Sequence, residues 1–203
     1  MFNGPSYEVT HQNGQWLTLL PENQYQGMSG NNIIFKIPNA PGWYLDFNDT
    51  YILVEVKIMK PDDTPVAKEL VAFENFALGT LFKDVSFTTS NQTKLEGETQ
   101  SYAYRSYMYA LINAPFNAKK FQLSIAGWSR DDAGKFDAQY TAAAAAVGGA
   151  TAVKWAGNEG FHIRRQWTMD GSTIQLVGPV FLDTWMQQQY FIDDQHYNYN
   201  QTQ

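Results

Sequence analysis

Apolar and polar side chains alternate in several short stretches of the chain. Across residues 51–60, the even positions from 52 to 58 carry isoleucine or valine, whereas Glu55 and Lys57 occupy odd positions. Successive residues of a strand point to opposite faces, so this segment predicts a half-buried strand. The same pattern and residue composition predict further strands at residues 16–20, 33–37, 83–89, 121–125, 161–169, 173–184 and 186–192.

Asp170 and Gly171 separate two of these predicted strands. An Asp-Gly pair between strand-like segments is typical of a two-residue hairpin turn with positive φ, so we expect a hairpin there. Gly178 and Pro179 interrupt the second of the two strands. Because proline cannot donate a hydrogen bond to a central ladder, this pair predicts an edge, a bulge or a bend.

Two segments have helical spacing. A helix is expected from a cap at Thr99 or Ser101 to about Asn113, and Pro115 prevents much continuation. A shorter helix is expected within residues 73–82. One face of the longer helix carries Tyr104, Met108, Leu111 and Ile112. Its tyrosines at 102, 104, 107 and 109 spread around the helix axis, which favours packing in a core or an interface over a stacking platform for bases or sugars.

The strand pattern limits which fold class and which domain organisation are expected. Eight short strands favour a mainly β, two-sheet barrel or sandwich over a βαβ arrangement. A chain of 203 residues is long enough for one such domain, which we expect to span residues 1–203. Residues 138–157 are rich in alanine and glycine and are expected to form a flexible insertion, or to order only against a neighbouring subunit. Residues 193–203 form a polar C-terminal tail.

Composition excludes several classes of function. The formal net charge of -6 argues against a broad phosphate-binding surface, so no direct nucleic-acid partner is expected. The chain has no cysteine, which excludes disulfides and thiolate metal sites. Neither a signal peptide nor an apolar run long enough to span a membrane is present, which predicts a soluble protein. Aromatic residues make up 15% of the chain, and such residues are favoured at interfaces as well as in cores.

No pattern of catalytic or ligand-binding chemistry stands out. The three histidines, His11, His162 and His196, lack the spacing of a metal pair. The adjacent carboxylates Asp131 and Asp132 are expected to diverge as solvated turn residues, like the other Asp-Asp pairs at 62–63 and 193–194. One of Arg164 and Arg165 is expected to pair with a carboxylate. We therefore expect no catalytic residue, no metal and no cofactor.

Several segments together resemble a known family. Residues 101–113 read SYAYRSYMYALIN and are similar to the YxYRAYIExLLN block of the penton-type minor capsid proteins of Polinton/Maverick elements and related double-stranded DNA viruses. Residues 174–187, IQLVGPVFLDTWMQ, resemble the family's VxLIGPLHxDIFxQ strand. Further similar segments lie in the same order at 34–38, 44–47, 76–87 and 127–134. The resemblance covers most of residues 14–192; the alanine and glycine insertion departs from it.

The resemblance carries expectations about fold, assembly and location. It implies an antiparallel jelly-roll sandwich and a structural, non-enzymatic protein of the virion, made inside the host cell. Its partners would be itself, as a homopentamer at icosahedral vertices, and the surrounding major capsid protein. For Arg105 we expect a structural role, pairing a carboxylate or capping loop carbonyls. The family-motif residues with structural roles would be Tyr102, Tyr104, Arg105, Tyr107, Gly178, Pro179 and Asp183.

Two alternatives remain at this point. Within the structural class, the chain is a major capsid protein or half of a double jelly roll, which would form trimers rather than pentamers. From another class, a carbohydrate-binding β-sandwich module would also be acidic, rich in tryptophan and free of cysteine. Such a module should show exposed, coplanar rings, for which the candidates are Trp43, Trp128, Trp155 and Trp185.

Overall fold

The computed structural model describes most of the chain between Gly14 and Thr202. The described residues are 14–22, 32–38, 42–66, 71–89, 93–97, 101–135, 141–147, 150–187, 190–192 and 197–202. For 141–147, 150–156, 192 and 197–202, the description covers the backbone alone.

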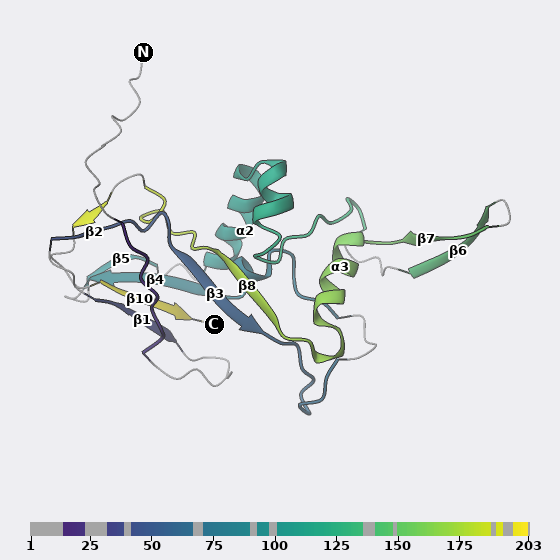
Figure 1. Cartoon of the computed structure of the whole chain (residues 1–203), viewed down its shortest axis with the longest axis horizontal. Coiled ribbons are helices and arrows are strands. Elements are labelled where there is room, and N and C mark those ends of the chain that lie inside the picture. Colours follow the sequence, from purple (N-terminus) through teal and green to yellow (C-terminus); the bar gives the residue numbers. More distant parts are fainter. Residues whose placement is uncertain are drawn as a thin grey trace, which may run out of the picture.

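The largest sheet has four antiparallel strands in the order β1-β10-β4-β5 (Figure 1). In the register of the first three strands, Phe35 lies opposite Tyr199, which lies opposite Phe87. The predicted strands at 33–37 and 83–89 are confirmed. The four strands are β1 (Ile33–Ile37), β4 (Asp84–Thr89), β5 (Lys94–Glu96) and β10 (Tyr197–Thr202).

The remaining described strands form three separate antiparallel pairs. They are β3 (Tyr51–Val56) with β8 (Ile174–Pro179), β2 (Tyr44–Leu45) with β9 (Phe191–Ile192), and β6 (Thr141–Val147) with β7 (Ala150–Ala156). Strand β3 and the first half of the strand expected at 173–184 are confirmed. One four-stranded sheet and three pairs do not make the expected eight-stranded jelly-roll sandwich, so that prediction of the fold class is wrong.

The fold differs from the predicted sandwich partly because helices form where strands were expected. They are α1 (Ala77–Thr80), α2 (Tyr102–Asn113), the π-helical turn η1 (Ala118–Gln122), α3 (Glu159–Thr168) and the 3₁₀ turn η2 (Met169–Gly171). Both η1 and α3 replace expected strands, at 121–125 and 161–169. Residues 16–20 have no strand, and of the described residues 186–187 and 190–192 only the last two are assigned to one. The fold therefore mixes helices and sheets.

Helix α2 confirms the helix expected to end near Asn113, but its apolar face is not the one it buries. The buried positions are Tyr102, Ser106 and Ala110, spaced four residues apart. Ser106 donates a hydrogen bond from its hydroxyl to the Gly79 carbonyl (2.7 Å), and Ala110 is fully buried. Two of the three buried positions thus carry small side chains, while Leu111 and Ile112 stay exposed. Ser101 occupies the N-cap position without a side-chain capping bond; Thr99 lies outside the described residues.

Helix α3 was missed because its buried face is polar. Gly160, Arg164 and Thr168 recur at a spacing of four residues and are the buried positions. A search for apolar periodicity cannot detect such a face. The helix begins after Asn158, whose side chain accepts hydrogen bonds from the Gly160 and Phe161 amides. That residue is a favourable N-cap and was the one available signal.

The Asp170-Gly171 pair lies in the turn between a helix and a strand. Both residues have positive φ, +57° and +69°, as their types predict. The turn joins α3 to β8 rather than two strands, so the predicted hairpin is wrong. Gly178 and Pro179 end β8 in a two-stranded sheet, where every strand is an edge strand.

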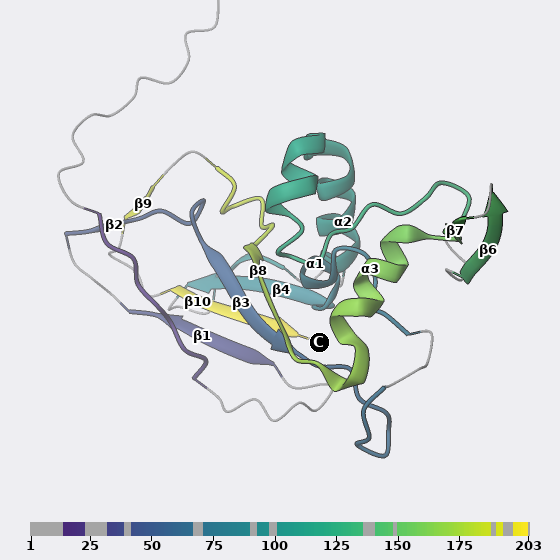
Figure 2. The same cartoon turned by 45° about the vertical axis from the view of Figure 1, so that its right-hand side comes forward.

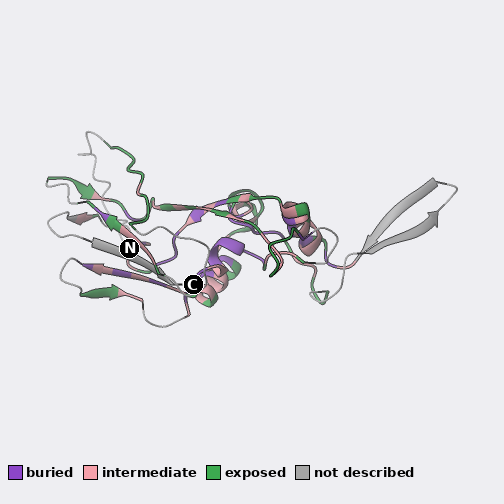
Figure 3. Ribbon diagram, turned by 90° about the horizontal axis from the view of Figure 1, so that it is seen from below, coloured by how far each residue is buried: buried purple, intermediate pink, exposed green. Residues whose placement is uncertain are grey.

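The core lies where the four-stranded sheet, the β3–β8 pair and the segment around α1 meet. Phe87 of β4, Leu176 of β8 and Leu78 of α1 are all at most 3% exposed and belong to one cluster. Aromatic rings fill its centre: Phe47 stacks on Trp185 with ring centroids 4.9 Å apart and meets Phe87 edge-on at 5.2 Å. Figure 3 shows the buried residues gathered in the middle of the molecule.

The alanine-rich segment forms an antiparallel β6–β7 hairpin that extends away from the other elements (Figures 1 and 2). Thr141 lies opposite Ala156 at its base, and Val147 lies opposite Ala150 near its tip. Strand pairing is therefore present where the sequence shows no alternation. The tail expected at 193–203 contains β10, which is the second strand of the large sheet.

Candidate functional site

Arg105 joins helix α2 to two distant segments. Its Nη2 donates to Glu96 Oε1 (2.7 Å) and to the Phe181 carbonyl (3.1 Å). Its Nη1 donates to Asp183 Oδ2 (3.3 Å). Both kinds of contact considered from the sequence, to a carboxylate and to a loop carbonyl, are present. The motif blocks at 101–113 and 174–187 thus meet at this side chain.

Glu96 is the centre of this junction and was not singled out in the sequence. Its carboxylate also accepts hydrogen bonds from the amides of Asp183 and Thr184, at 2.8 Å each, and from the Thr184 hydroxyl. Burial alone would raise the pKa of this carboxyl, but the hydrogen bonds from Thr184, Asp183 and Arg105 outweigh it. The pKa of Glu96 therefore lies below its ordinary value. The contact spans 88 residues along the chain, so no local pattern predicts it.

Tyr102 anchors the same junction from its buried side. Its hydroxyl oxygen accepts a hydrogen bond from the Phe181 amide (3.2 Å). Burial raises the pKa of Tyr102 to about 12, because the phenolate would lose its hydration. Tyr102, Arg105 and Asp183 therefore lie together.

The other family-motif residues lie elsewhere. Tyr107 stacks on Trp128 with ring centroids 6.0 Å apart, while Tyr104 is 70% exposed. Gly178 allows close packing, since a Cβ there would lie 2.8 Å from Leu78 Cδ2. Pro179 pairs with Tyr51 of β3. These residues are packed in the interior or exposed at the surface in different places, so they do not form one site.

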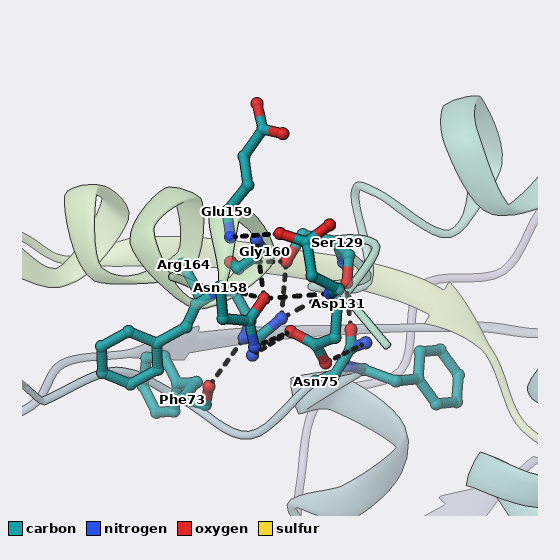
Figure 4. Close-up of polar contacts among 11 residues, drawn as sticks. Phe73, Asn75, Ser129, Asp131, Asn158, Glu159, Gly160 and Arg164 are labelled. Atoms are coloured by element: carbon teal, nitrogen blue, oxygen red, sulfur yellow. Dashed lines mark hydrogen bonds and ion pairs between the residues drawn. The ribbon is translucent and has the colours of Figure 1, made fainter. Parts of the chain in front are cut away.

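A second polar cluster surrounds Arg164, which is itself buried (Figure 4). Arg164 donates from Nε to the Phe73 carbonyl (3.0 Å), from Nη1 to Ser129 Oγ (2.7 Å) and from Nη2 to Asp131 Oδ1 (2.9 Å). The side chains of this ion pair are 5% and 10% exposed. Arg164 thus fulfils the expectation that one of the two adjacent arginines pairs with a carboxylate.

Two buried asparagines also donate hydrogen bonds to the carboxylate of Asp131. Asn158 Nδ2 donates to Oδ1 (2.8 Å), and Asn75 Nδ2 donates to Oδ2 (2.9 Å). The interpretation of Asp131 as a solvated turn residue is therefore wrong. Its neighbour Asp132 accepts a hydrogen bond from the Glu159 amide at an exposed position. The sequence interpretation failed because the partners come from segments that lie far from Asp131 along the chain.

The cluster lies at the base of the β6–β7 hairpin. The chain enters the hairpin after residues 131–135 and returns through Gly157 and Asn158. Asn158 and Asp131 are bonded directly, so the two ends of the excursion are held together next to the core. Gly160 lies so close to the opposite segment that a Cβ would come within 2.4 Å of the Arg130 carbonyl oxygen. This arrangement fixes where the hairpin leaves the body of the protein.

The chemistry of both clusters is that of structural contacts. In each, the carboxylate accepts hydrogen bonds from several donors at once, so its oxygen atoms are engaged by groups of the protein itself. Ser129 donates its hydroxyl proton to the Gly160 carbonyl and accepts from Arg164, neither of which is a base that could activate it. Among the residues that the structure describes, no group of three or more His, Cys, Asp or Glu side chains is placed to hold a metal ion. No helix in the described part of the chain could cross a bilayer.

One hollow of about 310 Å³ lies beside β8. It is an open depression lined by uncharged residues, namely Ser124, Ile125, Trp167, Ile174, Gln175 and Leu176. Binding sites for small molecules usually enclose their ligand and place a few convergent polar groups around it. This depression is open to solvent and its lining carries no charged group.

The tryptophans considered for sugar binding do not form a platform. Trp128 and Trp185 are 8% and 3% exposed, while Trp43 is 44% exposed. The side chain of Trp155 lies outside the described residues. The exposed ring of Trp16 is tilted by 45° against its neighbour Tyr51. These rings lack the coplanar arrangement that a flat sugar-binding face requires.

Comparison with known proteins does not assign the chain to a family. No family model, curated protein or solved structure matches it.

Proposed function

We propose that this protein is a non-enzymatic structural protein that works by assembling with copies of itself. The observation that carries the proposal is the outward-facing apolar stripe of α2. Tyr104 and Ile112 are 70% and 69% exposed, and Leu111 is 44% exposed, while Tyr102, Ser106 and Ala110 occupy the buried face. A helix normally buries its apolar stripe, so this surface is suited to a protein partner.

The polar clusters support the same function. Glu96 and Asp131 are engaged in several hydrogen bonds each, and their contacts tie together segments distant in the sequence. Such contacts make a rigid subunit, which lowers the entropy lost when subunits associate. A rigid subunit with exposed aromatic residues is what a shell protein requires.

The kind of assembly follows from the sequence resemblance. Penton-type minor capsid proteins form pentamers within a shell of major capsid protein, so we propose a virion protein with those partners. The fold gives no support to the pentamer, because the described strands do not form the eight-stranded sandwich expected for the family. The support is the collinear order of the similar segments, together with the contact between two of them at Arg105.

Negative-stain imaging of the purified protein tests this proposal. The expected result is a population of closed rings with cyclic symmetry, five-fold if the penton assignment holds. Particles with the dimensions of a single chain at micromolar concentration would contradict self-assembly. Three-fold particles would contradict the penton assignment and favour a major capsid protein.

A further inference from the structure

Two exposed apolar surfaces lie on different elements of the chain. The first, the α2 stripe, consists of Tyr104, Leu111 and Ile112 of the helix and of Phe116 just beyond its end, and these residues are 44–70% exposed. The second, the β3 patch, consists of Trp16, Tyr51 and Leu53, which are 56–76% exposed.

The β3 patch is formed by strand alternation and by one neighbouring ring. Tyr51 and Leu53 occupy alternate positions of β3 and share its outer face, while Ile52 and Val54 turn toward the core. The ring of Trp16 lies 6.2 Å from that of Tyr51, centroid to centroid. Aromatic residues clustered at the surface are typical anchors of protein interfaces.

The charges around the two surfaces have opposite sign. Residues 101–130, which include the α2 stripe, contain no acidic residue and four basic ones. Arg105 is already paired with Glu96 and Asp183, and the other three are Lys119, Lys120 and Arg130. Residues 42–56, which include Tyr51 and Leu53, contain Asp46, Asp49 and Glu55 and no basic residue. Glu55 follows Leu53 on the same exposed face of the strand. Lys57 comes next, but its side chain lies along the turn at Gly171.

We infer that the α2 stripe of one copy docks on the β3 patch of the next copy. This inference rests on the proposed self-assembly and specifies the surfaces that meet. Each surface offers the apolar area and the charge that complement the other, so a second copy of the chain is the partner that both fit. A contact between two different surfaces of identical subunits leaves one of each free, and it therefore continues until a ring closes.

The exposed side chains are large enough to contribute most of such a contact. An aromatic residue buries about 150–250 Å² when fully covered, and a stable interface buries about 800 Å² on each partner. Two aromatic residues on each side, together with the exposed aliphatic side chains beside them, therefore supply the apolar centre, and the surrounding charges set orientation and association rate.

Two single substitutions that each disable one surface test the inference. Leu53→Asp disables the β3 patch. Tyr104→Asp disables the α2 stripe, and an acidic residue in the first turn of a helix is compatible with folding. Val71→Asp is the matched control, because Val71 is an exposed apolar residue (42%) outside both surfaces. Circular dichroism and the unfolding midpoint show whether each variant is folded.

The masses in solution, measured by light scattering after gel filtration, are then compared. Each interface variant alone should be a monomer, Val71→Asp should keep the wild-type mass, and an equimolar mixture of the two interface variants should give a dimer. The dimer forms because each variant retains the surface that the other lacks.

The possible failures are distinguishable. A monomeric wild type would contradict the proposed function itself. An oligomeric wild type with oligomeric variants would leave self-assembly standing and overturn the choice of surfaces. If only one variant dissociates, the contact joins two identical surfaces and the head-to-tail arrangement is wrong.

Discussion

At the scale of single residues, Glu96 links pH to stability. Its pKa in the folded protein lies below the ordinary value of 4.5, so it contributes stability above that value and loses the contribution as pH falls below it. We expect Glu96→Gln to be less stable at neutral pH by about 1–3 kcal/mol, since hydrogen bonds to a charged group are lost. Denaturant unfolding at several pH values measures both effects. The variant should lose less stability than the wild type between about pH 5 and about pH 3, and equal pH dependence would contradict this role.

Arg164 should be the more sensitive of the two adjacent arginines. Arg164→Met leaves the buried carboxylate of Asp131 without its ion-pair partner, which costs about 3–5 kcal/mol. Arg165→Met is the matched control, because Arg165 is half-buried and directly follows Arg164 in the same helix. We expect the control to lose at most about 1 kcal/mol. Similar losses in the two variants, measured by chemical denaturation, would argue against the structural importance of the buried cluster.

At the scale of elements, α2 shows how far the sequence predicts the fold. The helix was predicted from its spacing and from Pro115, and the strands β1, β3 and β4 from alternation. The buried face of α2 was not predictable from hydrophobicity, because Ser106 and Ala110 are buried for their small size. Helix α3 was missed for a related reason: its buried face contains Arg164, which is neutralised by a residue 33 positions away.

The small buried residues of α2 lead to an element-scale prediction. Ala110 is fully buried, and helix α1 lies against α2. Ala110→Leu should therefore overpack this contact and cost about 1–3 kcal/mol. Ile112→Ala, on the exposed side of the same helix, should leave the unfolding free energy of the dissociated subunit within about 0.5 kcal/mol. Thermal or chemical unfolding of both variants in dissociating buffer gives the comparison. A greater loss for Ile112→Ala would mean that the two faces have been assigned the wrong way round.

The β6–β7 hairpin is expected to contribute little to folding. Its strands pair with each other, and the contacts that hold its base, between Asp131 and Asn158, lie outside it. Replacing residues 141–156 by a short Gly/Ser linker should therefore leave the unfolding midpoint nearly unchanged. Calorimetry of the shortened chain measures this. Asn158→Ala in the same shortened chain is the control that should lower the midpoint, because it removes a helix cap and a bond to Asp131. A large loss from the linker alone would place the hairpin in the folding core.

At the scale of the whole molecule, the proposed self-assembly rests on the exposed apolar surface together with the two polar clusters. The described residues provide two rigid junctions, around Glu96 and around Asp131, and they leave the apolar stripe of α2 outside. The central claim is that this surface is covered by another copy of the chain.

Native mass measurement of the purified wild-type protein tests that claim most directly. The chain has a mass of 23.1 kDa. At micromolar concentration the account predicts a single oligomer whose mass is a whole multiple of this value, five-fold for a penton. A mass of 23.1 kDa under the same conditions would contradict it.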